Sequence, residues 1–350
     1  MTPPSISIGG KQLEKYRSVY LVAEIGSNHD NDINRARNLI QLAKECGADA
    51  AKFQSFTAKG LISKRGFEKR SSSFQSRWKK SVWDTYVSAE MPRDWHYELA
   101  DFAKSQSIDF FTSPWDDEAL DYLVKIDAPA IKIGSGDIDN YDLLRKAGLT
   151  KKPILLGTGA STMGEVETAV NVIRSTGNNE IVLLHCVVNY PSNINQSNIR
   201  VLPVMESAFD LPVGYSDHSP GSLVATSAVS LGATVIEKHF TDDRSREGPD
   251  HSHSMNPKEF KEMVYNIRTL QSALGDGIKT PVDDEKETKV LQRRSIFAIK
   301  PIKKGQKLTK ENVRLLRPAI GIAPKYWDVV IGRTVTRDIE QDEPVQWSMI

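Results

Sequence analysis

Short apolar runs recur along most of the chain, and segments with the periodicity of an amphipathic helix separate them. The first run, VYLVAEIGSN at 19–28, is nearly continuous, as in strands that are buried on both faces of a parallel sheet. The segment after it places apolar residues on one helical face, and Gly47 is positioned to end that helix. This pattern predicts eight strands, at residues 19–28, 50–56, 108–115, 130–136, 153–159, 181–187, 212–218 and 235–241.

Helical segments follow most of these strands. In the last of them Asn256 suits an N-cap, Glu259 completes a capping box and Gly275 ends the helix. Eight strand–helix units favour an α/β fold of the (β/α)8 TIM-barrel class. An open doubly wound sheet is the alternative, but no glycine-rich dinucleotide-binding fingerprint follows the first strand. Further helices are expected at 32–46, 92–106, 116–126, 163–175 and 221–231.

Two parts of the chain do not follow this alternation of strands and helices. Residues 57–91 form either a surface excursion or a substrate loop, because they are polar with interspersed aromatic residues. Residues 276–293 are charged and poor in apolar residues, which predicts a linker.

The tail has strand signals around a Lys-Lys-Gly turn, with short helices expected at 311–318 and 326–332 and strands after 334. The predicted domains are a barrel at 1–275, a linker at 276–293 and a small β-rich domain at 294–350. The aromatic residues of 57–91 are Phe67, Phe74, Trp78, Trp83 and Tyr86.

Composition narrows the class of protein. The 350 residues are 39% hydrophobic and 26% charged, as is typical of soluble globular proteins. A formal net charge of +1 argues against a protein that binds nucleic acid or a membrane surface. The two cysteines, Cys46 and Cys186, are too few for a disulfide framework and fit a reducing compartment. Because there is neither a signal peptide nor an apolar run of about 20 residues, we expect a cytoplasmic protein.

Polar residues gather at the C-terminal ends of the expected strands, which is where barrel enzymes carry their chemistry. They supply carboxylates, ammonium groups, hydroxyls and imidazoles within one ring of strand ends. These residues are Glu24, Ser27, Asn28, His29, Lys52, Gln54, Thr112, Ser113, Lys132, Ser135, Asp137, Thr158, His185, Cys186, Asn189, Tyr190, Ser216, Asp217, His218, Glu237, Lys238 and His239.

Two of these residues, Lys52 and Lys132, are lysines inside otherwise apolar strands, where a charge is costly unless an anion accompanies it. A structural ion pair with a neighbouring glutamate would satisfy either lysine alone. For both together we favour a site for a phosphate or carboxylate, since the Gly-Ser-Gly at 134–136 lets backbone N–H groups approach an anion. A Schiff base on Lys132 is a weaker alternative.

His218 and His239 lie near the ends of neighbouring strands, in the stretch around which the barrel chemistry is organised. A single histidine at a strand end is more often hydrogen-bonded than metal-bound, but two on adjacent parallel strands favour a shared ion. Two imidazoles leave positions open for a catalytic ion that acts as a Lewis acid. Asp250, His251 and His253 in the following loop offer further ligands or sugar contacts.

With these residues identified, the chain resembles the sialic acid synthases, which include N-acetylneuraminate, legionaminate and pseudaminate synthases. The tail, with IKKGQKL at 302–308 and LLRP at 315–318, is similar to the antifreeze-like (SAF, β-clip) domain that ends such enzymes. Each motif alone is weak, but seven in order at barrel strand ends are specific. They are AEIGSNH (23–29), AKFQ (51–54), KIGSGD (132–137), HC followed by NYP (185–191), YSDH (215–218), EKHF (237–240) and GPDH (248–251).

The resemblance implies a transferase that condenses phosphoenolpyruvate with the open-chain aldehyde of an N-acylated mannosamine-type sugar, with N-acetylmannosamine as the leading acceptor. The products would be a nine-carbon 2-keto acid and phosphate, released by C–O cleavage. It also implies a divalent ion, Mn²⁺ or Mg²⁺, that His218 and His239 hold and that polarises the aldehyde, and a domain-swapped homodimer whose tail reaches the partner's barrel. The implied roles are phosphoenolpyruvate binding by Lys52, Lys132, Ser135, Ser216 and Ser113, catalysis by Glu24, Glu237 and Asp137, and sugar binding by Tyr190, Asp250 and Arg317.

The sequence departs from the family pattern at a few positions. Asp137 stands where many relatives have glutamate, and Ala319 follows the arginine motif where glycine is usual. Asn31, Gly157 and Val188 also differ from some relatives. Within the family the sequence favours the neuraminate and legionaminate branch over the pseudaminate one. The other hypotheses are an aldolase that makes a seven- or eight-carbon keto acid from a phosphosugar, and a non-catalytic polysaccharide-binding protein.

Overall fold

The computed structural model describes residues 6–69 and 80–350, and the chain divides after Gly275 into two compact units. The first unit holds one large apolar core, and the second has a smaller core of its own. No helix in the described ranges is long and apolar enough to cross a membrane. Cys46 and Cys186 are both buried, free thiols.

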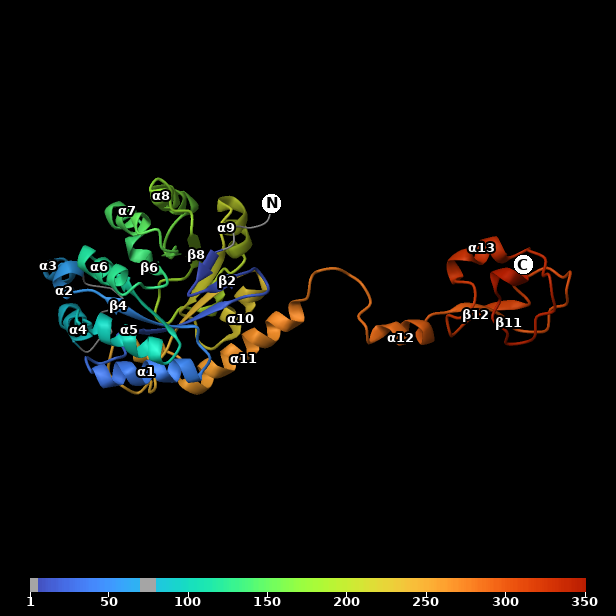
Figure 1. Ribbon diagram of the computed structural model, residues 1–350, viewed down its shortest axis with the longest axis horizontal. Helices are drawn as coiled ribbons and strands as arrows, with labels where there is room; N and C mark the ends of the chain where they lie inside the picture. The colour runs from blue at the N-terminus through green and yellow to red at the C-terminus, as the bar shows by residue number, and fades with distance from the viewer. Residues whose placement is uncertain (1–5, 70–79) are drawn as a thin grey trace. The chain divides into compact units, whose positions relative to one another are not determined.

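The first unit is an eight-stranded parallel barrel, which confirms the predicted TIM-barrel fold (Figure 1). Hydrogen bonds connect the strands in the order β5-β4-β3-β10-β9-β8-β7-β6, and the two end strands, β5 and β6, lie side by side. Almost every strand residue is buried, as the continuous apolar runs require. The strands are β3 (Tyr20–Gly26), β4 (Ala50–Ser55), β5 (Asp109–Pro114), β6 (Ile131–Ile133), β7 (Ile154–Gly157), β8 (Ile181–His185), β9 (Val213–Asp217) and β10 (Val235–His239).

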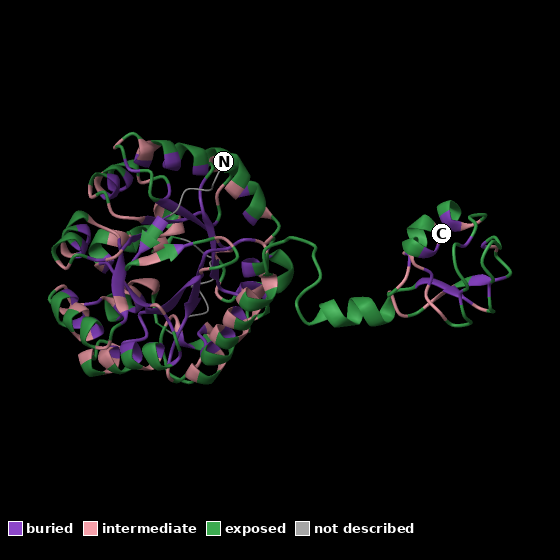
Figure 2. Ribbon diagram, turned by 45° about the vertical axis from the view of Figure 1, so that its right-hand side comes forward, coloured by how far each residue is buried: buried purple, intermediate pink, exposed green. Residues whose placement is uncertain are grey.

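Helices surround the strands, with their apolar faces inward and their polar faces exposed (Figure 2). The predicted capping box of the last barrel helix is present, with reciprocal bonds between Asn256 and Glu259. Helix α9 is not predicted by the apolar pattern, because Pro203 interrupts it; the proline falls in the first turn, where a missing N–H needs no partner. The barrel helices are α1 (Ile33–Glu45), α5 (Trp95–Ser105), α6 (Asp117–Lys125), α7 (Tyr141–Leu149), α8 (Met163–Arg174), α9 (Val201–Phe209), α10 (Leu223–Ser230) and α11 (Pro257–Leu274).

Short elements supplement the eight strands and their helices. An antiparallel pair precedes β3, and three short helices lie between β4 and α5. Residues 70–79, which include Phe74 and Trp78 of the predicted substrate loop, lie outside the described residues. The elements are β1 (Ile6–Ile8), β2 (Lys11–Leu13), α2 (Ala58–Leu61), α3 (Lys64–Glu68), α4 (Val82–Ala89), η2 (Ser135–Asp137), η3 (Ile194–Gln196) and η4 (His251–His253).

The second unit is built around an antiparallel pair of strands, in which Ile296 is opposite Leu315. The helix predicted at 311–318 is wrong, because Val313 and Arg314 alternate between core and solvent and pair with the first strand. Residues 276–293 contain a helix, and the strands expected after 334 are reduced to isolated bridges. The elements are α12 (Glu285–Gln292), β11 (Ser295–Ala298), β12 (Val313–Leu316), η5 (Pro324–Tyr326), α13 (Trp327–Val330) and η6 (Trp347–Met349).

Candidate active site

Strand register brings the polar residues to one end of the barrel. The β3–β10 pairing sets Glu24 opposite His239, and the β3–β4 pairing sets the same Glu24 opposite Lys52. On the next pair of strands Ser216 is opposite Glu237. Because all these strands are parallel, the side chains converge at the carboxyl edge of the barrel, where the sequence predicts the chemistry.

A buried cluster of two lysines and two glutamates occupies the centre of this edge. Lys52 Nζ lies 2.6 Å from Glu24 Oε2 and 3.7 Å from Glu237 Oε2. Lys132 Nζ lies 3.2 Å from Glu237 Oε1. All four side chains are buried, so their formal charges cancel within a region that excludes water. Of the two interpretations of the lysines, the structure shows the ion pairs with glutamate, and an anion site at the same ammonium groups stays a prediction.

Polar neighbours fix the orientation of the cluster. Ser216 Oγ donates to Glu237 Oε1 at 3.0 Å, and Gln54 Nε2 donates to Glu24 Oε1 at 2.8 Å. Lys52 Nζ donates to Ser113 Oγ at 3.2 Å. The Oε2 atom of each glutamate is buried and accepts no hydrogen bond from the part of the chain that is described. The Lys52 ammonium, 2.6 Å from Glu24 Oε2 and 3.7 Å from Glu237 Oε2, holds these two oxygens, and each keeps a lone pair that can accept a proton.

The two glutamates have shifted pKa values of opposite direction. Burial raises the pKa of Glu24, and the attraction of Lys52 only partly offsets that effect. Burial also disfavours ionised Glu237, but Lys132 and Lys52 outweigh it and hold the pKa of Glu237 below its ordinary value. Glu237 is therefore a permanent anion, whereas Glu24 is the carboxyl group better suited to proton transfer near neutral pH.

The predicted pair of metal-binding histidines lies beside this cluster. The rings of His218 and His239 have centroids 5.5 Å apart. His218 Nδ1 lies 2.8 Å from the Val187 carbonyl oxygen, so Nδ1 carries the proton and Nε2 keeps a free lone pair. Burial lowers the pKa of His218 to about 4 and lowers that of His239 well below its usual value. Both imidazoles are therefore neutral at pH 7, which is the form that binds a metal ion.

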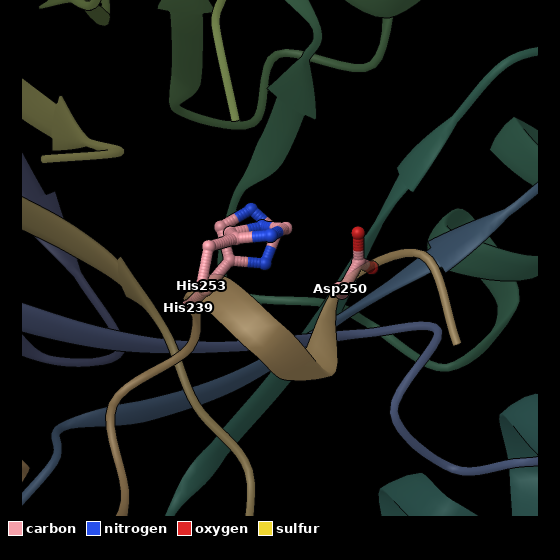
Figure 3. Close-up of side chains that lie close together, drawn as sticks. All are labelled: His239, Asp250 and His253. Atoms are coloured by element: carbon pink, nitrogen blue, oxygen red, sulfur yellow. The ribbon is translucent and has the colours of Figure 1, made fainter. Parts of the chain in front are cut away.

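A second group of possible ligands includes one member of that pair. One nitrogen of His239, one nitrogen of His253 and one carboxylate oxygen of Asp250 lie within 4.8 Å of one another (Figure 3). Asp250 Oδ2 accepts hydrogen bonds from the backbone N–H and the hydroxyl of Ser27, at 3.0 and 2.8 Å. Burial opposes ionisation of Asp250, but His239, His253 and the Ser27 bonds lower its pKa, so it is an anion. These residues fit a divalent cation.

The neighbouring His251 is a structural residue. Its Nε2 lies 2.8 Å from Asp30 Oδ1, and its Nδ1 lies 2.7 Å from Thr241 Oγ1. With both nitrogens engaged and the ring buried, it offers no lone pair to a ligand. Of the two loop histidines that the sequence suggests as ligands, only His253 is available.

A cavity of about 700 Å³ opens beside these groups. His239, Asp250 and His253 line it, and Tyr190 lies over the histidines, with ring centroids 4.3 Å from His218 and 5.3 Å from His253. Gln54 also lines it and bonds to Glu24, which links the cavity to the charged cluster behind. This volume is in the range of small-molecule sites. Its aromatic and apolar wall includes Phe56, Leu61, Phe67, Tyr86 and Trp115.

Three predicted site residues have other surroundings: Ser135 and Asp137 lie in the barrel unit, and Arg317 belongs to the second unit. The Ser135 hydroxyl contacts Cys186 Sγ at 3.1 Å and accepts a bond from the Gly159 N–H at 3.0 Å. Asp137 is in the cavity wall with a buried, unpartnered Oδ2, and burial raises its pKa. Arg317 is an exposed residue of the second unit. The roles predicted for these residues remain predictions.

Sequence reasoning missed the roles of two residues. The sequence predicts Gln54 as a strand-end residue without a function, although it lies two positions after Lys52 and so faces the same side of the strand, where it bonds to Glu24. Ser27 anchors the Asp250 carboxylate across more than two hundred residues, and no local pattern signals that contact.

Comparisons with known proteins identify the family to which the chain is similar. The NeuB family model matches residues 39–279, and the SAF domain model matches residues 293–350. N,N'-diacetyllegionaminic acid synthase of Legionella pneumophila is 36% identical and covers 95% of this chain and 94% of its own length. Pseudaminic acid synthase of Helicobacter pylori is 35% identical, over 93% of this chain and 96% of its own. The crystal structure of N-acetylneuraminic acid (sialic acid) synthetase from Leptospira borgpetersenii superimposes with a TM-score of 0.73 at 31% identity, over 82% of this chain and 95% of that chain.

Proposed function

This chain belongs to the NeuB family and ends in a SAF domain, and we propose that it condenses phosphoenolpyruvate with the open-chain form of an N-acylated mannosamine-type sugar. The leading acceptor is N-acetylmannosamine, and the products are a nine-carbon 2-keto sugar acid and inorganic phosphate. The proposal rests on one observation above all, the buried cluster of two lysines and two glutamates beside a group of neutral histidines.

The lysines supply the binding site for phosphoenolpyruvate in this proposal. The phosphate and carboxylate of this substrate are anions of the kind that Lys52 and Lys132 require, and Ser113 and Ser216 lie within hydrogen-bond distance of the cluster. When the substrate binds, its charge takes over part of the pairing that the glutamates provide in the empty site. Because Glu24 has the raised pKa, it is the glutamate that accommodates this change by taking up a proton.

The reaction needs one new C–C bond and the cleavage of one C–O bond. C3 of phosphoenolpyruvate attacks the sugar aldehyde carbon, and the aldehyde oxygen takes up the proton that Glu24 gained when the substrate bound. Water then adds at C2 and loses one proton to Glu24, which is by then ionised. The C2–O bond breaks, C2 becomes the keto carbon, and the second proton of the water leaves with the phosphate. Glu237 stays ionised and keeps both lysines in place. A divalent ion, Mn²⁺ or Mg²⁺, bound by His218 and His239 would polarise the aldehyde.

The sugar occupies the cavity in this proposal. Tyr190 and Asp250 line it and offer a phenol and a carboxylate to the sugar hydroxyls, and Asp137 in the wall is a further acid–base candidate. Arg317 would reach the N-acyl group from the SAF domain of a partner subunit, in a domain-swapped homodimer. We place the enzyme in the cytoplasm, without a nucleic-acid or membrane partner.

Phosphate release from phosphoenolpyruvate, measured with Mn²⁺, tests the proposal. The acceptor panel holds N-acetylmannosamine, mannose, 2,4-diacetamido-6-deoxymannose and arabinose 5-phosphate, and His239→Ala serves as the blank. Release with N-acetylmannosamine and none from the blank is the expected result. Release with the diacetamido sugar instead would assign the chain to legionaminate synthesis, which the 36% identity to the Legionella enzyme favours as the second candidate. Release with arabinose 5-phosphate alone, or none with a folded and metal-loaded protein, would overturn the proposal in favour of a phosphosugar aldolase or a polysaccharide-binding protein.

A further inference from the structure

We propose that His253 is a metal ligand of this chain and that, with His239 and Asp250, it forms a two-histidine, one-carboxylate site. Such a site takes a first-row transition ion such as Fe²⁺, Co²⁺ or Zn²⁺ in preference to Mg²⁺. The inference rests on the proposed function and revises its metal site. The ion keeps His239, takes Asp250 and His253 in place of His218, and belongs to a stated class, so Asp250 binds the ion instead of the sugar.

The three side chains already converge. One potential ligand atom from each lies within 4.8 Å of the others, and the rings of His239 and His253 have centroids 4.7 Å apart in an edge-to-face arrangement (Figure 3). Two ligands with bonds of about 2.1 Å to one ion lie no more than about 4.2 Å apart. Movements of the ligand atoms by about half an ångström, through small side-chain rotations, are therefore enough to close the site around an ion.

Two unsatisfied nitrogens give an independent reason to place a ligand here. His239 Nδ1 and His253 Nε2 are both buried, and neither has a hydrogen-bond partner within residues 6–69 and 80–350. His239 is only 5% exposed, so water does not readily compensate. A buried polar atom without a partner is costly, and a bound cation removes that cost. His251, two positions before His253, has both of its nitrogens bonded and shows no such deficit.

The loop that carries these ligands is held on both sides of His253. Before it, the His251 ring bonds to Asp30 and Thr241. After it, Ser254 Oγ donates to the Asp250 carbonyl oxygen at 2.6 Å and accepts from Asn28 Nδ2 at 3.0 Å. Ligands held in this way lose little conformational freedom when an ion binds. The structure therefore contains a prepared site rather than a chance cluster on an exposed loop.

The donor set determines which ions bind and where a substrate can reach them. Two imidazole nitrogens favour transition ions, whereas Mg²⁺ prefers oxygen ligands and retains its waters. Three protein ligands leave coordination positions open, and all three residues line the cavity in which the sugar is proposed to bind. The open positions of the ion therefore face the substrate space.

Cobalt binding to the metal-free, full-length protein tests the assignment without any substrate. Visible absorption reports the ligands of Co²⁺, and calorimetry gives its Kd and that of Mg²⁺. The variants are His253→Ala, His253→Gln and, as a matched control, Ser252→Ala, which changes an exposed neighbour in the same loop. Wild type and Ser252→Ala should bind Co²⁺ at least about 100-fold more tightly than Mg²⁺, whereas loss of His253 should raise the Co²⁺ Kd at least about tenfold and alter the spectrum.

Unchanged Co²⁺ affinity and spectrum in both folded His253 variants would overturn the assignment, as would tighter binding of Mg²⁺ than of Co²⁺ by the wild type. His253→Gln preserves the argument if the alanine variant does not fold. Phosphate release is measured separately, so the two proposals fail independently. Turnover on the sugar panel with unaffected Co²⁺ binding would leave the reaction standing and remove His253. Weaker Co²⁺ binding by the His253 variants, together with a wild type that turns over no sugar, would keep His253 as a ligand and remove the proposed reaction.

Discussion

The buried charge cluster makes a quantitative prediction about stability. Lys132→Met removes the cation closest to Glu237 Oε1, at 3.2 Å, and leaves the region with one lysine and two glutamates. Breaking a buried ion pair by removing one partner typically costs about 3–5 kcal/mol. Glu237 keeps the hydrogen bond from Ser216 at 3.0 Å and the ammonium of Lys52 at 3.7 Å, so we expect a loss near the lower limit, about 3 kcal/mol.

Thermal unfolding followed by circular dichroism measures this loss. At about 2–4 °C for each kcal/mol in a large domain, Lys132→Met should lower the Tm of the barrel by about 6–12 °C. Lys146→Met is the matched control, because Lys146 forms ion pairs with Asp117 and Asp142 on the protein surface, where solvent screens such pairs and they contribute little to stability. Adding Glu237→Gln to Lys132→Met removes the uncompensated charge, so the double variant should be at least about 1 kcal/mol more stable than the two separate losses predict.

Equal Tm values for Lys132→Met and Lys146→Met would refute this reasoning. That result would mean that water or a proton already compensates Glu237 in the folded state. The cluster would then not be a desolvated charge network. The physical reason for assigning Lys52 and Lys132 to anion binding in the proposed enzyme would be lost. A loss in the double variant equal to the sum of the single losses would show that Lys132 and Glu237 do not interact.

Three further predictions concern pH, catalysis and assembly. Burial lowers the pKa of His29 and of His96 to about 4, so folding favours the neutral form of both rings. Their contribution to the free energy of unfolding is fully present above pH 6.5 and is lost as the pH drops towards 4, by up to about 2 kcal/mol for each histidine at pH 5. An equal urea midpoint at pH 7.5 and pH 5 would contradict this. Glu24→Gln should lower kcat for phosphate release at least about 100-fold with little change in the KM for phosphoenolpyruvate, and a kcat near that of the wild type would place the base elsewhere. Arg317→Ala and His239→Ala subunits should each be nearly inactive, yet a mixture refolded together should recover about a quarter of the wild-type activity, because half of the dimers then have one complete site. No recovery would mean that the arginine acts within its own subunit.

The sequence predicts which residues form the site, but it does not predict which of them contact one another. The period of the apolar runs locates the strand ends, and so it identifies both lysines and both glutamates as neighbours of one edge. It does not reveal that Glu237 contacts Lys132, because β10 and β6 are four strands apart in the sheet order and meet only across the closed barrel. That contact depends on closure and register, which local sequence does not encode.

The wrong prediction of a helix at 311–318 in the second unit has a related cause. The segment with Val313 and Leu315 has an apolar pattern too short to separate a helix from a strand, and pairing with β11 decides the outcome. The distinction between His251 and His253 was equally invisible. The two histidines share one tripeptide, and only the contacts with Asp30 and Thr241 show which of them is structural.

The same burial acts differently on the two halves of the site, and this keeps their charges separate. It holds the imidazoles of His218 and His239 neutral, so that half has no cation of its own to repel an incoming metal ion, and Asp250 supplies a negative charge there. In the other half the lysines stay charged because the glutamates accompany them, and one of these glutamates has the raised pKa that lets it give up its charge when an anion arrives. In the proposed reaction, the anionic substrate and the metal ion would each have a compensating charge of its own, so that both could be bound at the same time.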